Sequence, residues 1–454
     1  MCGIIGIHNH PEAATLAYLG LHGLQHRGQE SAGMVTVKDS GLQCHHAMGL
    51  VADIFSQDVI DRLQANHAIG HVRYSTYGES HIKNCQPFLV NSMLGSMAVA
   101  HNGNLVNATE IQKKLEEDGA IFQSTMDTEV IVHLMAKSRK KKFIDRLKES
   151  LCQVEGAFSL LFLTKKKMIA VRDPSGFRPL VMGKKKDSWI VASETTALDL
   201  IGAKFVREIE PGEIVVFENG DYKSYRLAEN LPKRSHCIFE YVYFAKPDSH
   251  IFHRDVYEVR KGFGQMLAKE SQVDGDIVVP VPDSGVPAAI GYAQESGIPF
   301  EMGLVRNHYV GRTFIEPEQS IRHFGVKLKL GAVKNIIEGK RVVLIDDSIV
   351  RGTTSKKIVR MLRDAGAKEI HMRISSPPTK WPCFYGIDTP TRSELIAAKK
   401  SIKEIRNYIG VDSLKYLSVD SLYWFEKQSQ REWFCDACFT GKYPVGSDVI
   451  SNLI

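Results

Sequence analysis

The chain has 454 residues, of which 43% are hydrophobic and 24% are charged, a composition ordinary for a globular protein with two or three domains. The sequence has no apolar run of about 18 residues and no basic, apolar leader, so we expect no membrane span or secretory signal and a cytoplasmic location. The net charge of +6 is scattered and not interleaved with aromatic residues, which argues against a nucleic-acid groove and favours a phosphorylated small-molecule substrate.

Residues 1–230 alternate short strand patterns with helical patterns. The sequence predicts helices over residues 12–24, 108–117, 128–136 and 144–154. It predicts strands over residues 3–7, 32–37, 68–72, 97–100, 157–163, 168–171 and 214–217. This mixture indicates an α+β domain with stacked sheets.

The pattern changes after Leu231-Pro232 and indicates a second domain over residues 231–454. Apolar strands are expected at 276–280, 341–345 and 369–375, with helices from Gly285 to Ala293 and from Ser355 to Asp364. Strand, helix and strand at this spacing predict right-handed crossovers and a parallel sheet, which is an α/β fold.

Cys2 is the first residue with a possible chemical role. If Met1 is removed, one residue carries both a thiol and a free α-amine, and that amine titrates near pH 7.7–8.0. The amine can therefore act as the general base for its own thiol, which then attacks a carbonyl carbon. Considered alone, a cysteine in a buried strand is more often a structural residue.

The motifs around Cys2 resemble the glutamine amidotransferases with an N-terminal nucleophile. They are Cys2-Gly3-Ile4-Ile5-Gly6, the stretch QHRGQESAG at 25–33, HVRYST at 71–76, HNGN at 101–104 and Asp127-Thr128-Glu129. The resemblance implies that the Asn102 side chain and the Gly103 N–H form an oxyanion hole for the tetrahedral intermediate. Arg73 suits the glutamine carboxylate as a bidentate fork, and Asp127 suits its ammonium group. We interpret His101 as a supporting residue and not as the base.

A second constellation follows the strand at 341–345. Asp346 and Asp347 end this strand, and a loop rich in Gly and Thr then opens a helix. The backbone N–H groups and hydroxyls of this loop can surround a phosphate at the helix N-terminus, with ligands expected from Ser348, Arg351, Gly352, Thr353, Thr354 and Ser355. The carboxylates suit ribose hydroxyls and a Mg²⁺ ion, although an acidic pair also fits other Mg²⁺–nucleotide sites.

With its Gly-Thr-Thr-Ser loop, this segment resembles the phosphoribosyltransferase fingerprint for phosphoribosyl pyrophosphate. A second turn, Val281-Pro282-Asp283-Ser284-Gly285, resembles the pyrophosphate-binding turn of the same family, and its alternative is a plain strand-to-helix turn. The resemblance implies that Ser284 joins Asp346 and Asp347 at one Mg²⁺ ion per subunit.

Together the two halves resemble the glutamine phosphoribosylpyrophosphate amidotransferase family over almost the whole chain. The resemblance implies release of ammonia from glutamine and its transfer to phosphoribosyl pyrophosphate, giving phosphoribosylamine and pyrophosphate, the committed step of purine synthesis. It also implies a homo-oligomer and feedback inhibition by purine nucleotides. We further interpret residues 306–327 as a lid with Tyr309, Phe314 and Ile315 above an ammonia passage.

Four late cysteines form a possible metal site. Cys435 and Cys438 are spaced as C-x₂-C, and the single residues Cys237 and Cys383 could complete a set. Such a pair alone is compatible with zinc, an iron–sulfur cluster or no metal. The resemblance points to a subgroup with one 4Fe–4S cluster per subunit, which we expect to clamp the tail onto the second domain because the proposed chemistry moves no electron.

Two other functions remain open on the sequence alone. A phosphoribosyltransferase fold can sense its ligand without catalysis, since fold does not fix function, but this leaves Cys2, Arg73 and Asn102 without a purpose. A different amidotransferase, one that aminates a sugar phosphate, would share the first half, and the Asp346-Asp347 loop argues against it.

Overall fold

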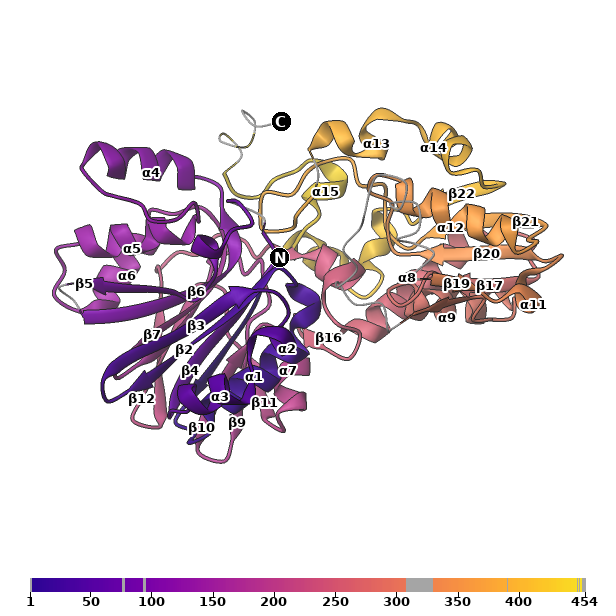
Figure 1. Ribbon diagram of the computed structural model, residues 1–454. Coiled ribbons are helices and arrows are strands. Elements are labelled where there is room, and N and C mark those ends of the chain that lie inside the picture. Colours follow the sequence, from indigo (N-terminus) through magenta and orange to yellow (C-terminus); the bar gives the residue numbers. More distant parts are fainter. Residues whose placement is uncertain are drawn as a thin grey trace.

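The computed structural model describes residues 2–75, 78–92, 95–307, 330–389 and 391–446, together with Asp448 and Ile450. Figure 1 shows two lobes, the first built from the N-terminal half and the second from the C-terminal half. Thr76 and most of the segment interpreted above as a lid, including Tyr309, Phe314 and Ile315, lie outside the described residues. Within the described ranges no helix is long and apolar enough to cross a membrane.

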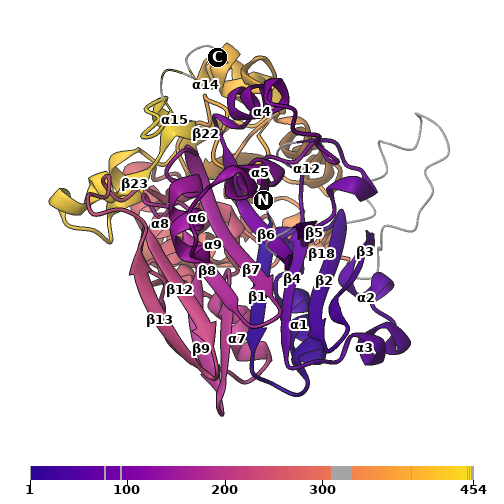
Figure 2. The same cartoon turned by 90° about the vertical axis from the view of Figure 1, so that its left-hand side faces the viewer.

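The first lobe contains two antiparallel sheets, which Figure 2 shows one in front of the other. The seven-stranded sheet has the order β11 (Lys204–Glu208), β9 (Val181–Lys185), β10 (Ser188–Ala192), β1 (Gly3–His8), β4 (His67–Arg73), β2 (Ser31–Lys38) and β3 (Gly41–Met48). The six-stranded sheet has the order β13 (Asp221–Arg226), β12 (Glu213–Glu218), β8 (Met168–Arg172), β7 (Gly156–Thr164), β6 (Gly95–Leu105) and β5 (Phe88–Ser92).

Alternating side chains of β1 show why these layers form. Ile4 packs into the core between the two sheets with Ile69 and Leu161, whereas Ile5 and Ile7 pack on the other face against helices. The helices of that core are α1 (Ala13–Gly23), α2 (Val51–Ile54), α3 (Gln57–Leu63) and α7 (Thr195–Leu200). The outer face of the six-stranded sheet is covered by α4 (Ala108–Glu117), α5 (Thr128–Lys137) and α6 (Phe143–Leu151). The predicted α+β domain with stacked sheets is confirmed.

The second lobe is built on a parallel sheet with the order β17 (Ile277–Pro280), β20 (Arg341–Asp346), β21 (Glu369–Ile374) and β22 (Ser413–Tyr416). One face packs on α8 (Val256–Glu270) and α9 (Val286–Ser296), and the other on α12 (Thr353–Asp364) and α14 (Ile402–Ile409). Smaller elements are β15 (His250–Ile251), β16 (Arg254–Asp255), β18 (Leu304–Arg306), β19 (Leu330–Ala332), α11 (Lys334–Ile337) and α13 (Ile396–Lys399). The predicted parallel α/β fold is confirmed.

The C-terminal tail returns to the junction of the two lobes. There β23 (Phe434–Cys435) pairs in parallel with β14 (His236–Cys237), and α15 (Ala437–Thr440) follows. Figure 1 shows α15, in yellow, close to this junction. The tail is therefore held by the segment that leads from the first lobe into the second.

One element that carries site residues is longer than predicted. The strand expected at 97–100 extends as β6 through Leu105, so His101 to Asn104 lie within a strand and pair with Leu160 to Ala157 of β7. These polar residues are consequently fixed by sheet hydrogen bonds, and they do not sit on a loop.

Candidate active sites

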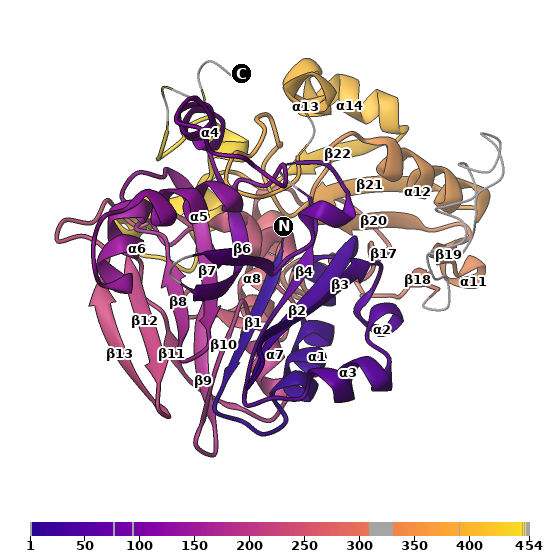
Figure 3. The ribbon, with the colours of Figure 1, turned by 60° about the vertical axis from the view of Figure 1, so that its left-hand side comes forward.

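Cys2 immediately precedes β1. Figure 3 shows the N-terminal end of the chain near the place where the two lobes meet. The Cys2 side chain is largely buried. Its backbone nitrogen lies 3.3 Å from Oδ1 of Asn102, and its carbonyl oxygen accepts a hydrogen bond of 3.0 Å from Nε of Arg27. The nucleophile predicted from sequence is thus held on both sides of its own backbone.

Asn102 is fully buried beside Cys2, and its side-chain NH₂ group is not used as a hydrogen-bond donor within the described residues. Its Oδ1 faces the nitrogen of Cys2, while its Nδ2 has no hydrogen-bond partner within the described part of the chain. A buried amide without a partner is costly in a folded protein. An unused N–H₂ next to a nucleophile is what an oxyanion requires, so the geometry agrees with the predicted role of Asn102.

Gly103 follows Asn102 on β6 and contacts β7 closely. A Cβ atom at this position would lie 1.9 Å from the carbonyl oxygen of Ala157 and 2.8 Å from Nε2 of His101. Only glycine fits this site without moving the strand. The backbone N–H predicted to complete the oxyanion hole therefore sits on a segment with little freedom to shift.

The two residues expected to hold glutamine lie in different settings. Arg73 is buried at the end of β4, with Nη1 3.2 Å from the carbonyl oxygen of Glu79 and 3.6 Å from the carboxylate of Glu30. Asp127, also buried, accepts a hydrogen bond of 2.9 Å from the Leu105 N–H. Its other oxygen lies 3.4 Å from His101.

His101 and Asp127 stabilise each other's charged forms. Burial alone would raise the pKa of Asp127, but His101 lowers it below its usual range. Burial alone would lower the pKa of His101, and the Asp127 carboxylate raises it. Both ring nitrogens of His101 have partners, Thr128 Oγ1 at 3.0 Å and the Ala157 carbonyl at 3.3 Å. This arrangement agrees with a supporting role for His101.

A buried network of charges connects Cys2 to the second lobe, and the sequence motifs assigned it no role. The guanidinium of Arg27, which holds the Cys2 carbonyl, pairs with Glu194 and with Glu240. Arg178 pairs with the same Glu240 at 3.2 Å, and all four side chains are fully buried. Arg27 lies in the QHRGQESAG motif, but this motif does not reveal its pairing with Glu240, which is 213 positions away in the sequence.

The predicted transferase residues converge at the carboxyl ends of β17 and β20. Ser284 Oγ donates a hydrogen bond of 2.5 Å to Asp347 Oδ2, and Ser348 Oγ donates one of 2.6 Å to Asp347 Oδ1. Burial raises the pKa of Asp346, and the neighbouring Asp347 carboxylate raises it further; burial also raises the pKa of Asp347. Two adjacent buried carboxylates and a hydroxyl are a suitable set of oxygen ligands for Mg²⁺.

The loop from Ser348 to Gly352 leads directly into α12, which begins with Thr353, Thr354 and the buried Ser355. Gly352 has a φ of 76°, a conformation that favours glycine. The backbone N–H groups at this helix start agree with the expected phosphate-binding loop. Arg351 is arranged differently, because its side chain is half exposed and lies 3.1 Å from Glu394.

A cavity of about 650 Å³ joins the two lobes at this site. Ser284 and Thr354 line it from the second lobe, and His26 lines it from the first. Its wall also contains three cationic side chains, Lys246, Arg260 and Arg306. A diphosphate is a good match for such a wall.

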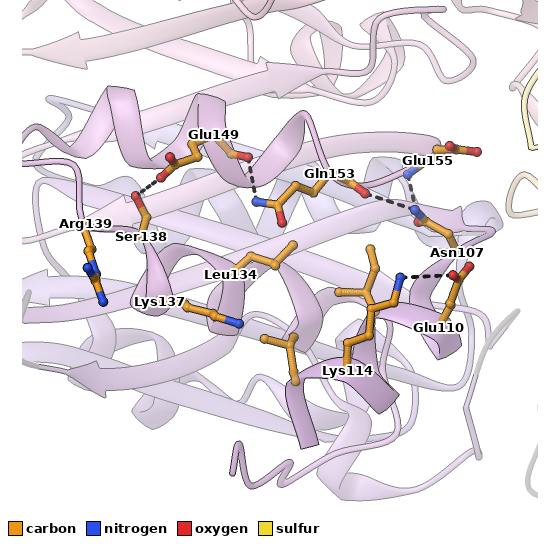
Figure 4. Close-up of a pocket in the computed structure, with 12 residues that line it drawn as sticks. Asn107, Glu110, Lys114, Leu134, Lys137, Ser138, Arg139, Glu149, Gln153 and Glu155 are labelled. Atoms are coloured by element: carbon orange, nitrogen blue, oxygen red, sulfur yellow. Dashed lines mark hydrogen bonds and ion pairs between the residues drawn. The ribbon is translucent and has the colours of Figure 1, made fainter. Parts of the chain in front are cut away.

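Another pocket lies elsewhere in the first lobe. Figure 4 shows this pocket of about 700 Å³ between α4, α5 and α6. None of the site residues predicted from sequence lines it, and its Lys114 already pairs with Glu110 at 3.2 Å. We assign it no role in the chemistry.

The four late cysteines come together from three segments at the lobe junction. Cys237 and Cys435 are register partners in the parallel β14–β23 pair, and Cys438 lies on α15. Cys383 lies in the irregular segment that follows β21. Burial raises the pKa of Cys435 and Cys438 well above the usual value, and the Cys237 and Cys383 thiols add to this rise. Across the residues that the structure describes, no group of three or more His, Cys, Asp or Glu that could hold a metal ion is found.

Comparison with known proteins assigns a domain family to each half of the chain. Residues 71–200 match the family model of a glutamine amidotransferase domain, and residues 258–375 match that of a phosphoribosyl transferase domain. Amidophosphoribosyltransferase 2, chloroplastic, of Arabidopsis thaliana is 55% identical over 446 residues, which cover 98% of this chain and 79% of the relative. Because that relative is chloroplastic by name, the cytoplasmic location stays a prediction.

Bacterial relatives extend this similarity to a solved structure. The amidophosphoribosyltransferase of Bacillus subtilis is 50% identical over 450 residues, covering 98% of this chain and 94% of the relative. The structure of glutamine phosphoribosylpyrophosphate amidotransferase from B. subtilis, complexed with ADP and GMP, superposes with a TM-score of 0.93 at 49% identity and covers 98% of each chain. With these identities over nearly its whole length, the chain belongs to the amidophosphoribosyltransferase family.

Proposed function

We propose that Cys2 releases ammonia from glutamine and that the Asp346–Asp347 site attaches this ammonia to 5-phosphoribosyl 1-pyrophosphate. The products are glutamate, 5-phosphoribosylamine and pyrophosphate, so the enzyme is a pentosyltransferase with a glutaminase activity. Family membership supports the overall reaction. The observation that carries the assignment of residues is the unused Asn102 amide, buried beside the Cys2 backbone.

The first half-reaction begins when removal of Met1 frees the α-amine of Cys2. Asn102 Oδ1, 3.3 Å away, orients this amine, which takes the thiol proton as the sulfur attacks the glutamine amide carbon. The Asn102 Nδ2 and the Gly103 N–H stabilise the oxyanion, and Arg73 and Asp127 bind the α-carboxylate and α-ammonium. Ammonia leaves, and water hydrolyses the thioester to glutamate.

The second half-reaction takes place where Ser284, Asp346 and Asp347 meet. The oxygens of Ser284, Asp346 and Asp347 would hold a Mg²⁺ ion, which would supply positive charge beside the pyrophosphate leaving group. The loop from Ser348 to Ser355, with Arg351, Gly352, Thr353 and Thr354, holds the 5-phosphate of the ribose through backbone N–H groups and hydroxyls. Lys246, Arg260 and Arg306 line the same cavity and attract the diphosphate.

The two half-reactions belong to two domains, the glutaminase domain over residues 1–230 and the transferase domain over residues 231–454. The boundary is supported by β13, which ends at Arg226, and by β14, which begins at His236 and already belongs to the second core. The cavity at the transferase site is lined from both domains, by His26 of the first and by Ser284 of the second.

One 4Fe–4S cluster acts as a structural clamp that ties the C-terminal tail onto the second domain. Its ligands are the four late cysteines, Cys237, Cys383, Cys435 and Cys438. Their convergence from three segments supports this assignment, since four thiolates are the usual ligand set of such a cluster. Purified protein should be brown and contain about four iron and four sulfide per chain. Colourless, active protein with one zinc ion would disprove the cluster.

The chain also binds purine nucleotides as feedback inhibitors and forms a homo-oligomer. The B. subtilis structure in complex with ADP and GMP supports the first point. Inhibition of initial rates by AMP, ADP and GMP, measured together with the mass in solution by light scattering, tests both. Equal rates with and without nucleotide, or a monomer at assay concentration, would contradict them.

The central experiment measures glutamate and pyrophosphate with either glutamine or a high concentration of ammonia as the nitrogen donor. Cys2→Ala should abolish pyrophosphate release with glutamine and retain it with ammonia, because the transferase site needs only an amine. Asp347→Asn should impair pyrophosphate release with both donors. A folded Cys2→Ala variant that loses both activities would refute this division.

A further inference from the structure

Residues of the transferase half contact the oxyanion strand of the glutaminase half. Gly386 has a φ of +98°, and a Cβ atom there would lie 2.9 Å from both the carbonyl carbon and the carbonyl oxygen of Gly103. Gly103 itself already lies against the Ala157 carbonyl of β7. The backbone of the proposed oxyanion glycine is therefore in close contact with two elements, one from each half of the chain.

The next residue on the same strand has a direct bond to the transferase half. Asn104 Nδ2 donates a hydrogen bond of 2.9 Å to the carbonyl oxygen of Phe384, a residue 280 positions away. Asn104 lies on β6 next to Gly103, so this bond ties the strand at the point where the oxyanion forms. Gly386 and Phe384 thus approach two consecutive residues of β6.

The segment 384–386 is itself held firmly. The buried Arg178 donates a hydrogen bond of 3.0 Å from Nε to the Tyr385 carbonyl. The Phe177 ring stacks on the Tyr385 ring with centroids 4.3 Å apart, and the Tyr385 hydroxyl donates a bond of 2.6 Å to the Val445 carbonyl. A support must be rigid to position a neighbour, and these contacts restrain Tyr385 at its ring, its hydroxyl and its backbone.

We infer that Gly386, from the transferase half, and Asn104, through its bond to Phe384 of that half, are positioning residues that hold the oxyanion hole of the glutaminase. This inference rests on the proposed function. Oxyanion donors act only if they point at the position where charge develops, and a displacement of about 1 Å can cost roughly a hundredfold in rate. The strand that carries the proposed oxyanion residues is therefore supported by backbone atoms of the second half of the chain.

Gly386→Ala is the first test, because its Cβ would push on the Gly103 carbonyl. With glutamine, kcat should fall about tenfold or more, and KM for glutamine should change less than about twofold. Pyrophosphate release with ammonia should be unchanged. Gly410→Ala is the matched control: Gly410 also has a positive φ, +87°, but no atom lies within 4 Å of the place that a Cβ would take there, so any strain is not passed to β6.

Asn104→Ala is the second test, which removes a bond without adding bulk. It should also lower kcat with glutamine while ammonia-dependent activity is retained. Alkylation of Cys2 by iodoacetamide, followed by mass spectrometry, should keep its wild-type rate, because the thiolate displaces iodide without forming an oxyanion. This readout separates a misplaced oxyanion hole from a damaged nucleophile.

The outcomes distinguish this inference from the proposed function. Wild-type kcat with glutamine in both Gly386→Ala and Asn104→Ala would overturn the inference, as would equal losses in Gly386→Ala and Gly410→Ala. Slower Cys2 alkylation or loss of the ammonia-dependent activity would also overturn it, since a general disturbance would then explain the result. Absence of glutamate release by the wild-type enzyme would instead refute the proposed function.

Discussion

Replacing Glu240 by Gln tests the buried charge network that joins the two lobes. The Glu240 carboxylate accepts bonds of 3.0 and 2.8 Å from Arg27 and of 3.2 Å from Arg178, and all three side chains are fully buried. Gln keeps the shape but removes the one negative charge that both arginines share. Removal of one partner from a buried ion pair costs about 3–5 kcal/mol. Arg27 keeps Glu194 as a second carboxylate partner, so we expect the loss to fall mainly on the pair of Glu240 with Arg178.

The assay is unfolding in urea followed by circular dichroism, with the change in apparent free energy of unfolding as the readout. The matched control is Glu218→Gln, because Glu218 pairs with Lys167 at 3.2 Å on the surface, with both side chains more than a third exposed. An exposed pair of this kind contributes about 0–1 kcal/mol. Glu240→Gln should also slow glutamate release, since Arg27 holds the Cys2 carbonyl. Equal unfolding curves for the two variants would refute the reasoning.

Three further predictions concern other parts of the molecule. Asn102→Ala should lower kcat with glutamine about 10²- to 10³-fold while ammonia-dependent pyrophosphate release persists; a fall below about tenfold would exclude Asn102 as an oxyanion donor. Burial, with His67 nearby, lowers the pKa of His8 from 6.5 to about 4. The unfolded chain therefore binds a proton near pH 6.5 that the folded chain binds only near pH 4, so the free energy of unfolding falls as the pH drops through this window. His8→Phe should make the free energy of unfolding depend less steeply on pH, which unfolding curves at several pH values would measure. An unchanged pH dependence would contradict this prediction. Gly352→Ala should raise KM for phosphoribosyl pyrophosphate about tenfold with either nitrogen donor. The left-handed conformation costs an L-residue about 1–2 kcal/mol, and the new Cβ would lie 2.9 Å from Ile396. An effect on the glutamine-dependent rate alone would be evidence against this prediction.

Much of the fold could be predicted because its hydrophobic patterns are local. The predicted ranges for β1, β2, β4, β7 and α4 agree with the observed bounds within about two residues. The polar sequence His101-Asn102-Gly103-Asn104 was not expected inside a strand. Its strand conformation comes from pairing with β7, and such tertiary pairing overrides the weak strand propensity of Asn and Gly.

The active-site residues were predictable to the extent that each lies in a short motif. Cys2 and Asn102 are adjacent in the structure, and so are Ser284 and Asp347. The contacts of Arg27 with Glu240 and of Asn104 with Phe384 were not foreseen, because these partners are 213 and 280 positions apart and no local pattern links them. The assignment of catalytic roles, of the Mg²⁺ ligands and of the cysteine ligands remains a prediction for the experiments above.

The shared Glu240 also limits how the enzyme could be rebuilt from parts. The motifs suggest two interchangeable modules, but a fragment that ends at residue 230 would take Arg178 away from both Glu240 and the Tyr385 carbonyl. A foreign glutaminase grafted onto this transferase would need an arginine at each of the positions of Arg27 and Arg178 to meet that buried carboxylate. We therefore expect a functional chimera only when these buried ion pairs are transplanted together with the catalytic motifs. A fusion point chosen from the sequence motifs alone should give two domains that do not pack against each other.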